Sequence, residues 1–412
     1  MVEAYIVDHC RTPRGIGKVG KGALAHLHPQ YLGATVLKAL SDRNGIDTSK
    51  VDDVIWGCSN QQAKQASDLG RMTALAAGYD VRASGVTLDR FCGSGLTATI
   101  FGAATIMAGM EDVVIAGGCE MMSHNAADPR ARRTTLMDAD NLHLRELHPQ
   151  VGQGICADAI ATIEGISRLA LEEFAVESQR RADHAMRHGY FSRSLVPVVN
   201  EDGSLALDRD EHPRPNTTLQ GLAGLNPAFE AGAAIDIDEN GTTQLDLIRR
   251  ALPDLEISFV HHAGTSSGVV DGAAAILLAS PDAVARNGWK ARARIVATAN
   301  VGDSPELMLN APVPAAQKVL AKAGLTLDDI DLFEVNEAFA VVTEKFIRDL
   351  KIDRDRINVN GGAIALGHPI GATGAILVGT LLDELERRDL KRGLVTMCAA
   401  GGMAPALVIE RI

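Results

Sequence analysis

Three segments of this 412-residue chain occur twice in the same order, and this internal repeat constrains its fold more than any other feature. Each copy contains a strand pattern, then a helix, an acidic turn and a second strand, then a Gly-rich loop, a helix and a β-branched strand. The paired segments are residues 4–15 with 293–305, 31–59 with 311–337, and 87–118 with 358–402. The repeat predicts two α/β halves related by pseudo-symmetry, each built on a buried, mainly parallel sheet.

The spacing of the copies predicts a long insertion in the first half. We expect an N-terminal half made of residues 1–121 plus 269–290, and a C-terminal half made of residues 291–412. Between them, residues 122–268 form a loop-rich insert with one clear amphipathic helix pattern and a proline-rich stretch.

Composition narrows the class of protein. With 46% hydrophobic residues and a formal net charge of −12, the chain is expected to bind neither nucleic acid nor an anionic membrane surface. The uncharged stretch 361–382 is interrupted by His368, Pro369 and several glycines, which favours a buried loop and helix over a membrane span. The N-terminus has neither a secretory nor a transit pattern, so a cytoplasmic location is expected. The six cysteines are scattered, which predicts reduced thiols and no metal site.

One cysteine lies where a strand pattern changes into a helix pattern. Cys92 stands in TLDRFCGSGLTATI, directly before Gly93, Ser94 and Gly95. The dipole and unpaired N–H groups of a helix start stabilise a thiolate, and small residues let a substrate carbonyl approach the backbone. Cys92 is therefore predicted to be the nucleophile of an acyl transfer, and a cysteine that only packs is the alternative.

The repeat indicates which other loops meet Cys92. The corresponding loop of the second half, GGAIALGHPIGATG, contains His368, whose imidazole can promote a thiolate and donate to an oxyanion. Asn336 and Cys398 follow strand patterns in the same half, and for Cys398 a buried cysteine at a strand end is the alternative. The 361–374 loop lacks the Lys-Ser/Thr ending of a nucleoside-triphosphate loop, so that function is not expected.

Seven blocks together resemble the thiolase family and occur in order along essentially the whole chain. They are FCGSGLTA, FAVESQRRA, HPRPNTT, AGTSSGVVDGAA, FEVNEAFA, GGAIALGHPIGATG and MCAAGG. The resemblance implies an α/β thiolase fold with two pseudo-symmetric βαβαβαββ halves, α/β/α/β/α layers and a loop-rich insertion for CoA binding and oligomer contacts. It also implies reversible acyl transfer between an active-site cysteine and CoA, which cleaves 3-ketoacyl-CoA to acetyl-CoA and acyl-CoA or condenses two acetyl-CoA molecules.

The resemblance also assigns roles to individual residues. Cys92 would carry the acyl group in a ping-pong mechanism, and His368 would activate it and hold the thioester oxygen. Asn336 would position a water in this first oxyanion hole. Cys398 would exchange the proton of the substrate α-carbon or the CoA thiol. A second oxyanion hole would use the backbone amides of Cys92 and Ala400, because removing an α-proton leaves an enolate that needs donors at its oxygen.

The CoA contacts follow from weaker matches. Ser267 matches the family serine that bonds the pantetheine arm, Ala263 lies in the same wall, and Arg214 aligns near the nucleotide end. A solvated loop arginine is the alternative for Arg214. The resemblance implies CoA and acyl-CoA as substrates, no permanently bound cofactor and no metal.

Partners are expected to be few. The family pattern suggests a homodimer or homotetramer, with a β-oxidation partner subunit as a further option and no membrane partner. The arginine cluster near the start of the insert is expected to be solvated rather than bound to CoA phosphates. It comprises Arg130, Arg132 and Arg133.

A few features depart from the family pattern. Asp89 stands where Asn is usual, and its charge would raise the pKa of Cys92 if it pointed inward. Ala400 replaces a glycine and would be strained at positive φ. Thr265 replaces a common Asn, and residues 230–257 form a longer segment that could alter the acyl pocket or an oligomer contact.

Two other functions stay open from the sequence. One is another condensing enzyme of the same fold, such as a ketosynthase, and the second active-site cysteine, Cys398, favours a thiolase over it. The other is a catalytically weak thiolase-like scaffold, which Asp89 and Ala400 leave open although the four predicted catalytic residues are all present.

Overall fold

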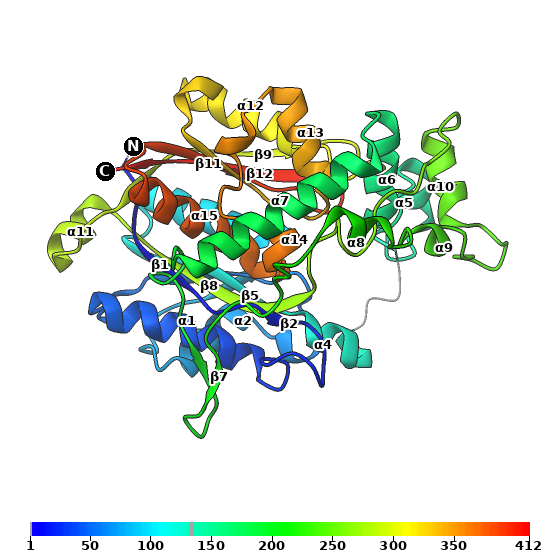
Figure 1. Ribbon diagram of the computed structural model, residues 1–412. Helices are drawn as coiled ribbons and strands as arrows, with labels where there is room; N and C mark the ends of the chain where they lie inside the picture. The colour runs from blue at the N-terminus through cyan, green and yellow to red at the C-terminus, as the bar shows by residue number, and fades with distance from the viewer. Residues whose placement is uncertain (1, 132–135) are drawn as a thin grey trace.

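The computed structural model describes residues 2–131 and 136–412 and consists of five layers (Figure 1). The N-terminal part contains β1 (Tyr5–Arg11), β2 (Gly15–Ile16), α1 (Pro29–Asn44), β3 (Asp53–Gly57), α2 (Leu69–Ala76), β4 (Val86–Leu88), α3 (Ser94–Met107), β5 (Val113–Met121), β8 (Val270–Ala279) and α11 (Pro281–Asn287). The C-terminal part contains β9 (Ala293–Gly302), α12 (Pro312–Ala323), β10 (Leu332–Val335), α13 (Ala340–Leu350), α14 (Ala363–Leu366), α15 (Ile370–Arg387), β11 (Arg392–Thr396) and β12 (Met403–Arg411).

The strands join edge to edge in the order β10-β11-β12-β9-β1-β8-β5-β3-β4, with β2 beside β8. Within the sheet, the two halves are joined by a short pairing of Tyr5 and Ile6 of β1 with Arg294 and Ala293 of β9. This short junction lies beside the two chain ends (Figure 1). The sheet therefore behaves as two half-sheets that can stack on the same pair of helices.

Burial defines the layers. The apolar residues of α3 and α15 pack between the inner faces of the two half-sheets. Helices α1 and α2 cover the outer face of the N-terminal half-sheet, and α12 and α13 cover the outer face of the other. The α/β/α/β/α arrangement expected from the resemblance is confirmed.

The expectation of a mainly parallel sheet is wrong. β3 pairs parallel with β4 and β5, and β10 pairs parallel with β11, but the remaining pairs in this sheet are antiparallel. The loop from β11 to β12 spans only residues 397–402, and so short a connection joins antiparallel neighbours. In the first half β5 and β8 are also antiparallel neighbours, but a long insertion takes the place of a short loop between them.

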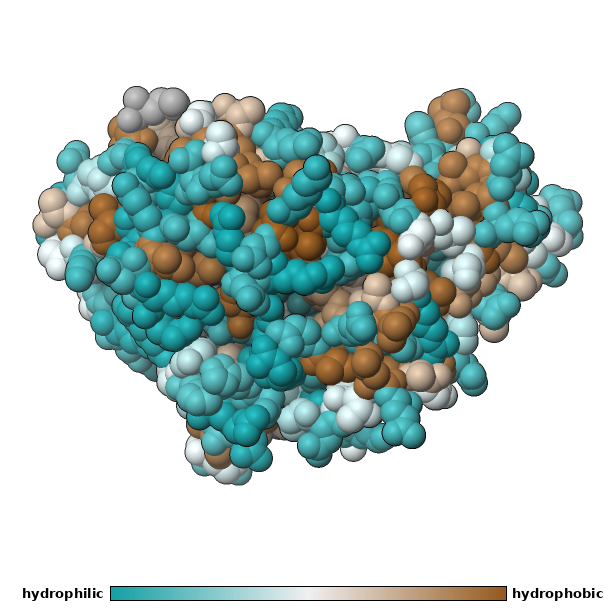
Figure 2. Space-filling view, turned by 45° about the horizontal axis from the view of Figure 1, so that its top comes forward, coloured by the Kyte–Doolittle hydropathy of each residue, from teal (hydrophilic) through white to brown (hydrophobic). Residues whose placement is uncertain are grey.

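That excursion runs from Met121, the last residue of β5, to Val270, the first of β8. Its helices and short strands are α4 (Met122–Ala127), α5 (Leu142–Leu147), α6 (Gln153–Ile163), α7 (Arg168–Arg187), β6 (Val198–Val199), β7 (Leu205–Leu207), α8 (Leu219–Ala223), α9 (Glu230–Ala233) and α10 (Gln244–Ala251). Buried residues of α6, α7 and α10 share a core with the start of α13. The face seen in Figure 2 is mainly hydrophilic, with small groups of apolar residues.

The uncharged stretch 361–382 forms α14, a loop and the first part of the buried helix α15. Within the described part of the chain, no helix has the length and apolar character needed to cross a bilayer. The expected buried loop and helix are confirmed.

Helices α3 and α15 touch through their first turns, where glycines replace side chains. The carbonyl oxygen of Gly371 lies 2.0 to 2.7 Å from the positions that Cβ atoms would take on three other glycines. These are Gly57 at the end of β3, Gly95 in α3 and Gly118 in β5. A Cβ on Gly374 would lie 2.0 Å from the backbone nitrogen of Leu96. Any side chain at these positions would separate the two helix starts.

We expect Gly374→Ala to lower the free energy of unfolding by about 1–3 kcal/mol or more, since an overpacked methyl must push α15 away from α3. The midpoint of urea unfolding measures this change. Gly232→Ala in α9 is the control, because the position that its new methyl group would take has open space for 4 Å around it. This control is expected to be neutral or stabilising by up to about 1 kcal/mol. Equal midpoints for the two variants would contradict the packing argument.

Candidate active site

A tight turn presents Cys92 at the start of α3. Phe91 adopts a left-handed backbone with φ 50°, and its N–H donates to Asp89 Oδ1 at 2.6 Å. The Ser94 hydroxyl donates to the Phe91 carbonyl at 2.6 Å and accepts from the Arg90 N–H at 2.9 Å. The turn is therefore closed by its own side chains, and α3 begins at Ser94 as the sequence predicts.

Cys92 lies in the wall of a cavity of about 360 Å³ and is only 4% exposed. Ala400 and Ile370, both from the second half, line the same cavity. The predicted nucleophile therefore shares one space with the turn after β11 and with the residue that opens α15. The polar lining residues are Ser59, Asn60, Asn125 and Gln153, and the other lining residues are Phe91, Ala131 and Met137.

Burial raises the pKa of Cys92 to about 11. A hydrogen bond from the Gln153 side chain favours the thiolate, while the charges of Glu120 and, least of all, Asp89 disfavour it. At neutral pH the group is therefore a thiol, which differs from the thiolate expected at a helix start. At this buried position, the loss of hydration raises the pKa of Cys92 by more than the start of the helix lowers it.

His368 is held by one hydrogen bond on each ring nitrogen. The Thr373 hydroxyl donates to the Pro369 carbonyl at 3.1 Å, so it can only accept from His368 Nδ1, at 2.5 Å. This leaves Nε2 unprotonated, 3.3 Å from the Asn336 amide nitrogen. Burial, with a smaller effect of the Arg14 charge, lowers the pKa of His368 to about 3. The ring is thus a neutral base with its lone pair on Nε2.

Cys398 is buried at the end of β11, and its pKa is raised by burial and by the neighbouring charge of a Cys92 thiolate. The turn after it is closed by hydrogen bonds between Ala399 and Met403. Its left-handed residues are Gly401 and Gly402, both at φ 76°, and Ala400 is not among the positive-φ residues of the described chain. The strain considered for Ala400 is therefore absent.

Glu120, at the end of β5, joins the two halves next to Cys92. Its carboxylate accepts from the backbone N–H groups of Ser59 at 2.9 Å, Asn60 at 3.1 Å and Gly371 at 3.0 Å, and from the Gln65 amide at 3.0 Å. Burial raises its pKa, and these donors oppose that effect. Sequence reasoning missed Glu120, and its only signal is an acid ending an otherwise apolar strand.

The predicted CoA residues do not line the cavity, and of the three only Ser267 lies next to a residue bonded to His368. Ser267 N–H donates to the Ala338 carbonyl at 3.0 Å, and His368 N–H donates to the Gly268 carbonyl at 2.9 Å. Ala263 is exposed on the same loop. Arg214 is exposed and lies two residues from His212, whose ring packs against Gly268. These residues can form one wall of an approach to His368.

Two of the less usual features, Arg130 and Thr265, have local explanations. Arg130 is paired with Asp128 at 2.7 Å and its side chain is 76% exposed, so it is solvated as expected. Arg132 and Arg133 lie outside the described residues. Thr265 is buried, and its hydroxyl accepts from His262 N–H at 3.0 Å, which closes the turn before Ser267.

The longer segment 230–257 supports the cavity from behind. Gln244 Oε1 accepts from Gly152 N–H at 2.7 Å, at the start of α6. The ring of Phe229 packs against Gly154. Both contacts flank Gln153, so Gln244 of this segment and the adjoining Phe229 position Gln153, which lines the cavity with Cys92. Sequence reasoning missed Gln153, because only the fold brings it to Cys92.

Two family models match the chain. The model "Thiolase, N-terminal domain" matches residues 4–238, and "Thiolase, C-terminal domain" matches residues 289–411. The chain belongs to the thiolase family. It is an acyltransferase of thiolase type, as the resemblance implied.

Similar proteins span the whole of this thiolase. A beta-ketoadipyl-CoA thiolase of Acinetobacter baylyi is 39% identical over 100% of both chains. The steroid 3-ketoacyl-CoA thiolase FadA6 of Mycobacterium tuberculosis is 40% identical, over 100% of this chain and 95% of its own. The crystal structure of human mitochondrial 3-ketoacyl-CoA thiolase in complex with CoA superposes with a TM-score of 0.84 and 32% identity, covering 100% of this chain and 98% of that one. The predicted thiolase fold is confirmed.

The raised pKa of Cys92, about 11, predicts how its alkylation depends on pH. Because only the thiolate reacts, the rate of iodoacetamide labelling at Cys92 should rise about tenfold per pH unit from pH 7 to 10. Peptide mapping by mass spectrometry follows the rate, with Cys92→Ser as the control for site identity. A plateau below pH 8 would instead indicate a preformed thiolate–imidazolium pair.

Proposed function

We propose that this thiolase cleaves 3-ketoacyl-CoA with CoA through an acyl-enzyme on Cys92, or runs the same steps backwards to condense two acetyl-CoA molecules. The observation that carries the proposal is the junction of the two halves. A buried thiol opens on a cavity at the start of α3, and a neutral imidazole whose unprotonated Nε2 faces the Asn336 amide lies beside the start of α15, which touches α3.

In the first step His368 Nε2 takes the Cys92 proton as the sulfur attacks the C3 carbonyl of the substrate. The C2–C3 bond then breaks, and its electron pair forms the enolate of acetyl-CoA. Cys398 donates a proton to that carbon, and acetyl-CoA leaves. Because the pKa of Cys92 is high and that of His368 is low, proton transfer accompanies attack rather than preceding it.

In the second step a CoA thiol gives its proton to Cys398 and attacks the acyl-enzyme, and the released Cys92 recovers a proton from His368. The amides of Cys92 and Ala400 would hold one oxyanion, and His368 with an Asn336-bound water would hold the other. Ser267, Ala263 and Arg214 are proposed contacts of the CoA chain. CoA and its thioesters are thus substrates, and the chemistry needs no resident cofactor.

The wider setting is proposed on the same basis. Residues 1–121 plus 269–290, 122–268 and 291–412 are proposed as the functional domains, with a homodimer or homotetramer as the working unit in the cytoplasm. A ketosynthase reaction is less well supported, since a Cys92 thiolate would raise the pKa of Cys398, as expected for a second thiol near the proposed nucleophile.

Acylation of Cys92 tests the proposal directly. After mixing with acetoacetyl-CoA, intact-protein mass spectrometry should reveal an acetyl adduct that maps to the Cys92 peptide and disappears when free CoA is added. Cys92→Ser should lose the adduct and at least about 10⁴-fold in turnover, because an alcohol is a far weaker nucleophile. Cys156→Ser, a buried cysteine of α6, is the control. Full turnover by Cys92→Ser would overturn the proposal.

The role of Cys398 is tested by exchange of the acetyl-CoA α-protons in D₂O, followed by NMR. Cys398→Ser should slow this exchange about 10²-fold or more, since it removes the acid–base group at the α-carbon. Cys119→Ser, a buried cysteine of β5, should exchange at the wild-type rate. Unchanged exchange in Cys398→Ser would assign the proton transfer to another group.

A further inference from the structure

Arg14, in the loop between β1 and β2, is a buried cation. The residue is only 5% exposed, yet its guanidinium forms no ion pair with the described residues. Asp210 is the carboxylate whose charge acts most on Arg14, but both of its oxygens are held by Arg11, at 2.8 Å each. The hydrogen bond from Arg14 to Asp210 comes from the backbone N–H, at 2.9 Å.

The other carboxylates near Arg14 are satisfied elsewhere or kept from ionising. Glu337 accepts from the Ser178 hydroxyl at 2.7 Å and from the Asn358 amide at 2.9 Å. Burial and the charge of Glu337 raise the pKa of Glu334, which disfavours its charged form. A buried guanidinium without an ion pair lowers the stability of a fold. Such exceptions are expected where function, rather than stability, decides which residue is present.

The Arg14 guanidinium reaches the loop that carries His368. Its Nη1 donates to the Gly367 carbonyl at 3.4 Å, and its Nε has no hydrogen-bond partner among the described residues. The Gly367–His368 peptide is also held at its nitrogen, because His368 N–H donates to the Gly268 carbonyl at 2.9 Å. Gly367 has φ 93°, and a Cβ atom there would lie 2.4 Å from the Val270 side chain. The backbone before the imidazole is therefore fixed on several sides.

The charge of Arg14 acts on the imidazole itself. After burial, it is the cause that lowers the pKa of His368. A positive charge close to the ring disfavours the imidazolium and therefore favours the neutral form, which accepts a proton at Nε2. Once the ring has taken the Cys92 proton, the same charge favours its return.

We propose that Arg14 is a positioning residue for His368 in the acyl transfer. Its guanidinium holds the peptide before the ring, and its unpaired charge favours the neutral imidazole. A carboxylate paired with Arg14 would cancel most of that charge, which gives the absence of an ion pair a physical reason. The inference rests on the proposed function and adds a residue to the same site.

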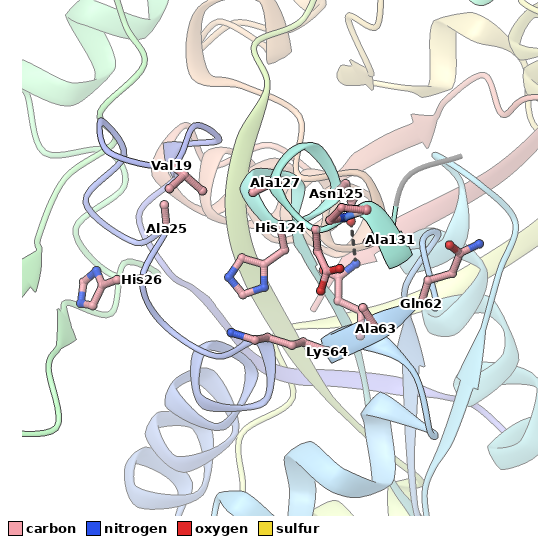
Figure 3. Close-up of a pocket in the computed structure, with 13 residues that line it drawn as sticks. Val19, Ala25, His26, Gln62, Ala63, Lys64, His124, Asn125, Ala127 and Ala131 are labelled. Carbon is pink, nitrogen blue, oxygen red and sulfur yellow. Dashed lines mark hydrogen bonds between the residues drawn. The ribbon is translucent and has the colours of Figure 1, made fainter. Parts of the chain in front are cut away.

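A second cation beside a histidine serves as the matched control. Lys64 and His124 line a neighbouring cavity of about 430 Å³, and the Lys64 ammonium extends toward the His124 ring (Figure 3). Burial and the Lys64 charge lower the pKa of His124. Lys64 is exposed, forms no ion pair with the described residues and is bonded to neither Gly367 nor His368. Its charge therefore acts on a different histidine.

Arg14→Met separates an effect on the reaction from an effect on folding. Methionine has a similar length but no charge and no N–H donor, and the pair of Arg11 with Asp210 stays in place. We expect kcat for thiolysis of acetoacetyl-CoA to fall about 10²-fold, because a small displacement of a reacting group has an effect of this size. KM should stay within about twofold. The midpoint of urea unfolding should be unchanged or higher, because an apolar side chain replaces an unpaired buried charge.

Two further variants test the role of the charge. Arg14→Lys keeps the positive charge without the planar donor group, so its kcat should be about tenfold above that of Arg14→Met. Lys64→Gln removes one positive charge from the neighbouring cavity and should keep the wild-type kcat and KM.

The outcomes distinguish the positioning role from the proposed function. Wild-type kcat in Arg14→Met, or a raised KM with unchanged kcat, overturns the positioning role while the proposed thiolysis stands. A lower unfolding midpoint with equal losses of kcat in Arg14→Met and Arg14→Lys assigns Arg14 to folding and also overturns it. If the wild-type enzyme forms no adduct on Cys92 and cleaves no acetoacetyl-CoA, the proposed function fails as well.

Discussion

The active site depends on backbone contact between two helix starts. The carbonyl oxygen of Gly371 sits among Gly57, Gly95 and Gly118, at distances that leave no room for a Cβ atom on any of them. Close packing of this kind fixes the relative position of α3 and α15, because protein interiors have few voids into which either helix could move. Cys92 precedes one of these helices and His368 the other, so their alignment follows from the glycines.

The Glu120 carboxylate reinforces the same junction electrostatically. It binds N–H groups from the loop after β3 and from the first turn of α15, and thus ties the two halves together where Cys92 emerges. A buried acid is costly unless its oxygens are satisfied, and here four donors satisfy them. The placement also puts a negative charge close to Cys92, which helps to keep the resting thiol protonated.

Burial governs the chemistry as much as geometry does. Cys92, the proposed nucleophile, and His368, its proposed base, are both almost fully buried, and burial drives both toward their neutral forms. In this state the thiol and the imidazole are both neutral, so no ion pair has to be separated when substrate binds. In the proposed mechanism, charge develops only when a thioester is present and its oxyanion can be stabilised.

The sequence by itself determined the family and the thiolase fold, and it supplied the four residues proposed here for catalysis, Cys92, Asn336, His368 and Cys398. These are local signals, because Gly-rich loops, strand ends and helix starts have recognisable patterns in adjacent residues of the sequence. The prediction of a mainly parallel sheet was wrong because the connection between two strands sets their relative direction. The sequence pattern of a single strand is the same in either direction.

Only the tertiary structure decided the electrostatics around Cys92 and which polar residues line the cavity beside it. The pKa of Cys92 is set by how completely the fold removes water, which the helix-start pattern does not encode. Glu120, Gln153 and Asn125 come from segments separated from Cys92 along the chain, and each carries an ordinary polar side chain with no pattern around it. Packing brings these distant segments together, so residues that carry no signal in the sequence become neighbours of Cys92.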